Sequence, residues 1–196
     1  MTKLLSDQVT KAEIDVILRE LEKVLSAGIV GDVTEFGCYV GTTSVYVASR
    51  LQRTNKQLYL YDSFAGLPPK TTQDISPAGE QFKEGELFAT KKQLIINLKK
   101  ANVPMPKIKK GWFSELSNED VPAAISFAFL DGDYYDSVLD PLKLIWDKLS
   151  PGAIIVVDDY ANEALPGAAK AVDEWLKSHT ATLRVQSSLA ILTLPN

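Results

Sequence analysis

Three acidic residues of the sequence could act together in metal chemistry. Asp131 directly follows the largely apolar run 125–130, and Asp158 and Asp159 directly follow the apolar run 153–157. If these runs are neighbouring parallel strands, they lie roughly 4.8 Å apart and the three carboxylates meet at one edge of the sheet. Carboxylates this close repel one another unless a cation neutralises them, and Mg²⁺ prefers such oxygen ligands. Spacing alone leaves a second interpretation open, in which these acids only cap helices or bind a ribose.

A turn that contains two glycines could bind a nucleotide. Residues 35–41 read Glu-Phe-Gly-Cys-Tyr-Val-Gly and connect an expected strand to an expected helix, as nucleotide-binding loops do. Gly37 and Gly41 would allow a ligand to approach the backbone closely, although a tight turn with no ligand is the alternative. Their spacing is not the G-x-G-x-x-G of dinucleotide-binding proteins, and no G-x-x-x-x-G-K-[ST] phosphate loop occurs. Asp62, at the end of the next strand, is well placed to accept hydrogen bonds from the two hydroxyls of a ribose.

Alternating strand and helix patterns would position these residues. Four helices are expected over 10–27, 42–52, 86–100 and 166–177. A fifth is expected where Leu139, Leu142, Trp146 and Leu149 form one apolar face. The expected strands cover 33–36, 58–61, 107–110, 125–130, then 153–157 after a turn at Pro151-Gly152, and a hairpin of 181–186 with 189–194. This order predicts an α/β fold with a doubly wound, mostly parallel sheet and a C-terminal antiparallel hairpin strand. Ligands of such sheets bind beyond the carboxyl ends of the strands.

Length and composition limit the class of protein. The 196 residues suit a single domain over 1–196, with an N-terminal helical segment over 1–30 and a polar segment over 64–85 that is long enough to be a lid loop. A net charge of −4 argues against a nucleic-acid partner. No apolar run reaches the roughly 20 residues of a membrane helix, and the N-terminus is not that of a signal peptide. The single cysteine, Cys38, cannot form an internal disulfide, which fits a cytoplasmic location.

Taken together, these residues give the chain a family resemblance. It resembles the class I S-adenosylmethionine-dependent methyltransferases, which have a Rossmann-like fold. Within them it is similar to the macrocin O-methyltransferase (TylF-like) family, which methylates sugar hydroxyls of macrolide and aminocoumarin antibiotics. The resemblance runs from about Val33 to Trp175 and rests on the segments 34–41, 61–68, 111–113, 130–137 and 149–160, which occur in order.

The resemblance implies a role for each candidate residue. The residues expected to bind the methionine part of S-adenosylmethionine are Glu35, Gly37, Tyr39 and Gly41. The residues expected to bind its ribose are Asp62 and Ser63. Trp112 would lie near the adenine, and Asp131 is also counted among the cofactor-binding residues. The Mg²⁺ ligands would be Asp131, Asp158 and Asp159, and the general base would be Asp133. Mg²⁺ would orient two adjacent hydroxyls of the acceptor and lower the pKa of the reacting one.

The acceptor implied by the resemblance is a hydroxylated small molecule, with a sugar of a natural product as the first expectation. A catechol-type O-methyltransferase would use Mg²⁺ and similar acids, so it is one alternative. A cofactor-binding protein without catalysis is another, although retention of both the glycine turn and the acids argues against it. A nicotinamide-dependent oxidoreductase should carry G-x-G-x-x-G, which is absent. No membrane partner is expected, and a homodimer is compatible with the resemblance.

Overall fold

The computed structural model describes residues 4–79 and 81–196, so residues 1–3 of the expected N-terminal segment and residue 80 of the expected lid loop lie outside it. The described residues form one seven-stranded sheet in the order β3-β2-β1-β4-β5-β7-β6. The strands are β1 (Asp32–Phe36), β2 (Leu58–Asp62), β3 (Lys107–Lys110), β4 (Ile125–Leu130), β5 (Leu149–Val157), β6 (Thr182–Gln186) and β7 (Leu189–Thr193). The α-helices are α1 (Lys11–Ser26), α2 (Thr42–Leu51), α3 (Lys91–Lys100), α4 (Tyr135–Ile145) and α5 (Pro166–Leu176).

The direction of the strands confirms the expected fold class. Within the set β1 to β5, each pair of neighbouring strands is parallel. Strand β7 is antiparallel to β5, and β6 is antiparallel to β7. The runs 125–130 and 153–157 pair as the expected neighbours, within β4 and β5. The strand order changes direction at β1, which has β2 on one side and β4 on the other. A ligand crevice is therefore expected beyond the carboxyl ends of β1 and β4.

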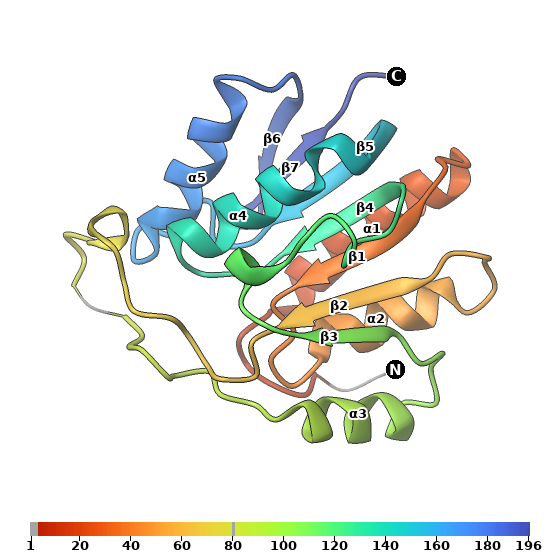
Figure 1. Cartoon of the computed structure of the whole chain (residues 1–196), viewed down its shortest axis with the longest axis horizontal. Helices are drawn as coiled ribbons and strands as arrows, with labels where there is room; N and C mark the ends of the chain where they lie inside the picture. The colour runs from red at the N-terminus through yellow and green to blue at the C-terminus, as the bar shows by residue number, and fades with distance from the viewer. Residues whose placement is uncertain (1–3, 80) are drawn as a thin grey trace.

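Helices cover both faces of the sheet, as Figure 1 shows. Phe127 and Phe129 of β4 belong to the apolar cluster that contains side chains of α1, α2 and α3, whereas Ala128 and Leu130 belong to the cluster with α4 and α5. Every residue of β4 is buried. A strand covered on both faces has no exposed side, which explains why every residue of β4 except Ser126 is apolar.

Helix α1 forms where the sequence predicts a helix. Glu13 donates its backbone N–H to the Thr10 hydroxyl at 3.3 Å, and its carboxylate accepts the Thr10 N–H at 2.7 Å, so the two residues form a capping box. Ile17 and Leu21 are fully buried on the face toward the sheet. No helix within residues 4–79 and 81–196 is long and apolar enough to cross a membrane.

The expectation of a helix over 86–100 is wrong at its start, because α3 begins at Lys91. The Thr90 hydroxyl accepts the backbone N–H of Gln93 at 3.1 Å and caps the helix there. Leu87, which the sequence placed on the helix, has a left-handed φ of +55°. It packs against the small cluster of Leu67, Tyr134 and Leu165 instead. Residues 86–90 therefore extend the loop that follows β2.

The boundary between α4 and β5 also differs from the expectation. Helix α4 ends at Ile145, a 3₁₀ turn covers Trp146–Lys148, and Leu149 begins β5 rather than closing a helix face. The expected turn at Pro151-Gly152 lies inside β5. Pairing of β5 with β4 is irregular there, since it passes from Leu149 opposite Ile125 to Ile154 opposite Phe127. A proline is tolerated in such an irregular stretch because no regular ladder hydrogen bond is required of it.

The segment between β2 and α3 is the longest connection in the chain. Among its described residues, 63–79 and 81–90, the one regular element is the 3₁₀ helix η1 (Thr72–Asp74). Figure 1 shows this segment, coloured yellow to yellow-green, extending beyond the carboxyl ends of the parallel strands. It therefore lies at the edge of the sheet where the candidate residues gather.

Candidate functional site

A cavity of about 690 Å³ lies at the carboxyl ends of the parallel strands. Its walls come from the segment before α1, the turns after β1, β3 and β4, the segment after β2, the first turns of α4 and the loop after β5. Eight of the eleven candidate residues line it: Gly37, Tyr39, Asp62, Ser63, Trp112, Asp131, Asp133 and Asp159. The other three, Glu35, Gly41 and Asp158, are buried behind the wall. The structure thus brings the glycine turn and the acidic residues to one site.

Gly37 is required by the close approach of two strand ends. Its φ is +90°, and a Cβ at this position would lie 1.9 Å from the carbonyl oxygen of Asp131. Asp131 also donates its N–H to the Phe36 carbonyl at 2.8 Å. Only glycine leaves room for this contact, which fixes Asp131 beside the turn. The sequence predicted space for a ligand, and the structure shows that the same glycine also makes room for the end of β4.

Asp62 holds the glycine turn from the neighbouring strand. Its Oδ2 accepts the backbone N–H groups of Cys38 and Tyr39 at 2.8 and 3.1 Å, and its Oδ1 accepts the N–H of Phe64 at 2.7 Å. An ionised carboxylate has about four acceptor positions, so most of them serve the protein itself. Asp62 is therefore both a wall residue and the support of the turn.

Glu35 lies beneath the turn and is 1% exposed. Its Oε1 accepts the Ser44 hydroxyl at 2.9 Å, whereas Oε2 is buried without a hydrogen-bond partner among the described residues. Burial raises the pKa of Glu35 to about 8, against the bond from Ser44 and with a smaller contribution from the charge of Asp62. A buried carboxyl with one unpaired oxygen is more stable protonated than charged.

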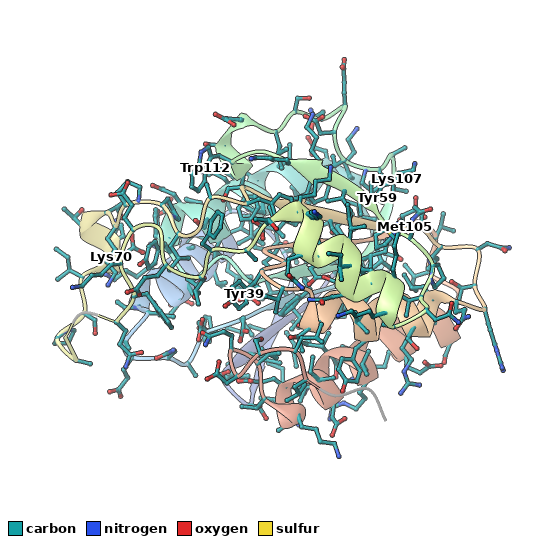
Figure 2. All side chains as sticks on the ribbon, turned by 90° about the horizontal axis from the view of Figure 1, so that it is seen from below. Tyr39, Tyr59, Lys70, Met105, Lys107 and Trp112 are labelled. Atoms are coloured by element: carbon teal, nitrogen blue, oxygen red, sulfur yellow. The ribbon has the colours of Figure 1, made fainter. Side chains whose placement is uncertain are left out.

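The other candidates for cofactor binding occupy different surroundings. Gly41 faces α3, since a Cβ there would lie 2.4 Å from Leu94 Cδ1. The Ser63 hydroxyl accepts the Ala65 N–H at 3.0 Å within its own turn. Tyr39 and Trp112, which are labelled in Figure 2, are half-buried and line the cavity from the turn after β1 and from the segment after β3.

Asp131, Asp158 and Asp159 meet as the sequence predicts. Each offers a carboxylate oxygen, and these atoms all lie within 4.8 Å of one another. Asp159 donates its N–H to Asp158 Oδ1 at 2.8 Å, and Asn162 Nδ2 donates to Asp159 Oδ1 at 2.8 Å. Burial, and then repulsion by neighbouring carboxylates, raise the pKa of Asp131 and of Asp158 well above the ordinary range. This arrangement could hold a divalent cation, whose charge would remove the repulsion.

Asp133 lines the cavity beside this cluster. Its φ of +60° is left-handed, which is uncommon for a residue other than glycine and occurs preferentially at functional sites. Burial, with a contribution from the charge of Asp159, raises the pKa of Asp133 to about 8. A carboxyl group with such a pKa can take up or release a proton near neutral pH.

Sequence reasoning missed Asp74 and Asn162, which also line the cavity. Asp74 is 3% exposed; its Oδ1 accepts the Tyr135 N–H at 2.7 Å, and its Oδ2 accepts the Thr71 N–H at 2.9 Å. The pattern of Thr71 followed three residues later by Asp74 could have indicated a local cap. No local pattern shows that Asp74 also caps α4, because Tyr135 lies 61 residues further along the chain.

The wall of the cavity is acidic. Besides Asp62, Asp131, Asp133 and Asp159, it contains four more aspartates, Asp7, Asp74, Asp136 and Asp140. Among the described residues that line it, none is lysine, arginine or histidine. The described part of this wall thus carries carboxyl groups and no basic side chain.

The sheet order, the terminal antiparallel hairpin and a cavity at the strand ends define the class I methyltransferase fold. The O-methyltransferase NovP matches with a TM-score of 0.80 over 93% of this chain and 79% of NovP, at 20% identity. The apo structure of CalS11, a TDP-rhamnose 3'-O-methyltransferase, matches with a TM-score of 0.64 over 92% of this chain and 76% of CalS11, also at 20% identity.

The chain belongs to the macrocin-O-methyltransferase (TylF) family, whose family model matches residues 6–187. One relative is the 8-demethyl-8-(2,3-dimethoxy-alpha-L-rhamnosyl)-tetracenomycin-C 4'-O-methyltransferase of Streptomyces olivaceus. It is 28% identical over 153 residues, which are 74% of this chain. The chain spans 58% of the length of that relative. The family expected from the sequence is confirmed.

Proposed function

We propose that this chain transfers a methyl group from S-adenosylmethionine to a hydroxyl of a sugar carried by a small natural product. The observation that carries the proposal is the meeting of the glycine turn, Asp62 and the three-carboxylate cluster around one cavity, in a member of the macrocin-O-methyltransferase family. The relative from Streptomyces olivaceus is named for O-methylation of a molecule that carries a rhamnosyl group, which supports both the reaction and the kind of acceptor.

The cofactor would lie across the carboxyl ends of β1 and β2. Gly37 and Tyr39 would contact its methionine part, while Glu35 and Gly41 would act from behind by shaping the turn. Asp62 and Ser63 would accept bonds from the ribose, with Asp131 close by. Trp112 would offer its ring to the adenine. The support for this placement is that the wall residues among these candidates line one continuous cavity.

The residues present fit a divalent cation. Asp131, Asp158 and Asp159 are oxygen donors within 4.8 Å of one another, which suits Mg²⁺. Burial and mutual repulsion hold the pKa of Asp131 well above its usual range, so the site favours positive charge. A bound cation would supply the charge that lowers the pKa of an acceptor hydroxyl.

Asp133 would act as the general base. The acceptor O–H bond breaks and its proton passes to the Asp133 carboxylate. The acceptor oxygen forms a bond to the methyl carbon while the carbon–sulfur bond breaks, and that electron pair stays on sulfur to leave S-adenosylhomocysteine. Burial raises the pKa of Asp133 to about 8, and a cation at the neighbouring aspartates would lower it again, so most of the activation of the acceptor hydroxyl would come from the cation.

Isothermal titration with S-adenosylhomocysteine, with and without Mg²⁺, tests the proposal. We expect one site with a dissociation constant on the order of micromolar. Absence of binding would contradict the cofactor. Transfer is then measured on rhamnosides and on catechols. Methylation of catechols alone would favour the catechol-type alternative, and binding without any transfer would favour a cofactor-binding role.

The remaining expectations from the sequence stay predictions. They are a single domain over 1–196, a lid loop over 64–85, a homodimer, a cytoplasmic location and the absence of nucleic-acid and membrane partners. Light scattering on the purified full chain measures the oligomeric state directly.

A further inference from the structure

The turn between β6 and β7 holds two serines in a backbone conformation that serine rarely adopts. Its two central residues, Ser187 and Ser188, have φ of +51° and +62° and lie between the paired residues Gln186 and Leu189. Two-residue hairpin turns with positive φ at both positions usually contain asparagine and glycine. Ser187 is exposed, whereas Ser188 is half-buried. A serine at the half-buried position is therefore expected to make a contact that glycine could not make.

Ser188 connects the start of α1 to the loop after β5. Its hydroxyl donates to Glu13 Oε1 at 2.7 Å, and its carbonyl accepts the Ala161 N–H at 2.9 Å. The next residue, Asn162, donates its backbone N–H to the Asp159 carbonyl at 3.1 Å and its side-chain amide to Asp159 Oδ1 at 2.8 Å. A continuous path of contacts thus runs from Glu13 to one of the three clustered carboxylates.

Glu13 is fixed at the beginning of this path by the cap of α1. Its Oε2 accepts the N–H and the hydroxyl of Thr10 at 2.7 and 2.8 Å, so the capping box leaves Oε1 for Ser188. Glu13 also lies near the cluster itself. Burial is the main cause of the raised pKa of Asp158 and of Asp159, and the charge of Glu13 contributes in both cases.

We infer that Glu13 and Ser188 are positioning residues that orient Asp159 for a divalent cation. The inference deepens the proposed function and rests on its metal assignment. Asp159 has a left-handed φ of +57°, a conformation that persists only where surrounding contacts maintain it. Hydrogen-bond partners that orient a metal ligand typically change metal affinity by roughly 10–100-fold. A bond that only tied α1 to the hairpin would change stability and leave metal affinity unaltered.

The test measures Mg²⁺ affinity and stability separately on the full chain. MgCl₂ is titrated into each variant by calorimetry, and urea denaturation without Mg²⁺ gives the unfolding midpoint. Ser188→Gly removes the hydroxyl but relieves the left-handed backbone, so its midpoint should stay near that of the wild type while Mg²⁺ binds at least about tenfold more weakly. Ser187→Gly is the matched control, which relieves the same backbone conformation and keeps the bond to Glu13. Its midpoint should rise and its Mg²⁺ affinity should equal that of the wild type.

A second pair of variants approaches the same path from α1. Glu13→Ala and Thr10→Ala each remove part of the capping box, so both should lower the unfolding midpoint. Only Glu13→Ala removes the acceptor of the Ser188 hydroxyl, and only it should weaken Mg²⁺ binding at least about tenfold. Because Ser188→Gly removes no charge, a loss in both variants separates orientation of Asp159 from the negative charge of Glu13. Affinity for S-adenosylhomocysteine should be nearly unchanged in all of these variants.

The outcomes distinguish the inference from the function on which it rests. Wild-type Mg²⁺ affinity in Ser188→Gly or in Glu13→Ala would overturn the inference. An equal loss of Mg²⁺ affinity in Thr10→Ala would also overturn it, because the effect would then follow the stability of α1. If the wild type itself binds no Mg²⁺, the metal assignment of the proposed function fails instead.

Discussion

The carboxylate of Asp62 accepts the backbone N–H of Cys38 at 2.8 Å, so the end of β2 holds the turn that follows β1. The bond joins residues 24 positions apart in the sequence. Its consequence is that a single side chain shapes the glycine turn and also lines the cavity. Changes at this position should therefore affect stability and ligand binding together.

Asp62→Asn tests that double role. An amide can accept on one oxygen only, so at least one of the three backbone N–H groups at this carboxylate loses its acceptor. We expect a loss of about 1–3 kcal/mol in the free energy of unfolding. The affinity for S-adenosylhomocysteine should fall at least about tenfold, measured by titration calorimetry.

Asp32→Asn is the matched control for Asp62→Asn. Asp32 accepts the backbone N–H of Gln57 at 2.9 Å near the start of β1, and it does not line the cavity. It should lose stability to a similar degree and keep its affinity for S-adenosylhomocysteine. Equal affinities of wild type and Asp62→Asn would remove Asp62 from the binding site.

Gly37→Ala should lower the free energy of unfolding by more than the strain of a left-handed backbone alone would. A Cβ at Gly37 would lie 1.9 Å from the Asp131 carbonyl oxygen, whereas Gly79, with a similar φ of +98°, has nothing within 4 Å. Gly79→Ala should cost about 1–2 kcal/mol for its backbone conformation. Gly37→Ala should cost at least about 2 kcal/mol more because of the contact with Asp131. Equal midpoints of the two variants in denaturant titrations would contradict the crowding.

The sequence predicted the fold well because its signals are local. The alternating apolar segments and the caps indicate each element, and the rule that parallel strands share an edge brings Asp131 to Asp158. The errors arise where distant contacts decide. Leu87 leaves the expected helix because it packs on Leu67 and Tyr134. The capping of α4 by Asp74 cannot be seen in the sequence, since no periodicity relates residues on separate loops.

Glu35 should make stability fall as pH rises. Burial raises its pKa from the ordinary 4.5 to about 8, so between these values the folded chain binds more protons than the unfolded chain. The contribution of Glu35 to the free energy of unfolding is fully present below its unfolded pKa and is lost as pH rises toward about 8. The slope is at most about 1.4 kcal/mol per pH unit.

Glu35→Gln removes this titration. When the pH is raised from 5 to 8, the free energy of unfolding of the variant should therefore fall less than that of the wild type. Urea denaturation at several pH values measures the difference between the two. Glu22→Gln, at an exposed position of α1, is the control and should follow the wild type. Parallel pH profiles for Glu35→Gln and the wild type would show that the buried carboxyl does not carry the effect.

Asp158→Asn should separate metal chemistry from cofactor binding. Asp158 belongs to the carboxylate cluster but does not line the cavity. We expect Mg²⁺-dependent transfer to fall at least about 100-fold while affinity for S-adenosylhomocysteine is nearly unchanged. The thermal midpoint of the wild type should rise on addition of Mg²⁺, and that of Asp158→Asn should not. Asp15→Asn, which is exposed on α1, serves as control. Full activity of Asp158→Asn would rule out the metal assignment.

Asp74 should anchor the loop between β2 and α3. Its carboxylate accepts the N–H of Tyr135 at 2.7 Å and the hydroxyl and N–H of Thr71 at 2.7 and 2.9 Å, so it joins the loop to the start of α4. Asp74→Ala leaves these groups without their acceptor and should cost about 1–3 kcal/mol of stability. It should also speed tryptic cleavage after Lys70 and Lys83, which flank this part of the loop.

Two further variants test the anchor at Asp74 from both sides. Gly167→Ala keeps every polar group but places a Cβ 2.0 Å from Asp74 Oδ1, so it should displace the carboxylate and speed cleavage in the same way. Gln73→Ala changes the exposed neighbour in η1 and should cleave at the wild-type rate. Because cleavage reports opening of the loop and not transfer, the result does not depend on the identity of the acceptor. Wild-type cleavage rates in both Asp74→Ala and Gly167→Ala would mean that the loop is held by its apolar contacts, those of Leu67 and Leu87 with Tyr134, rather than by Asp74.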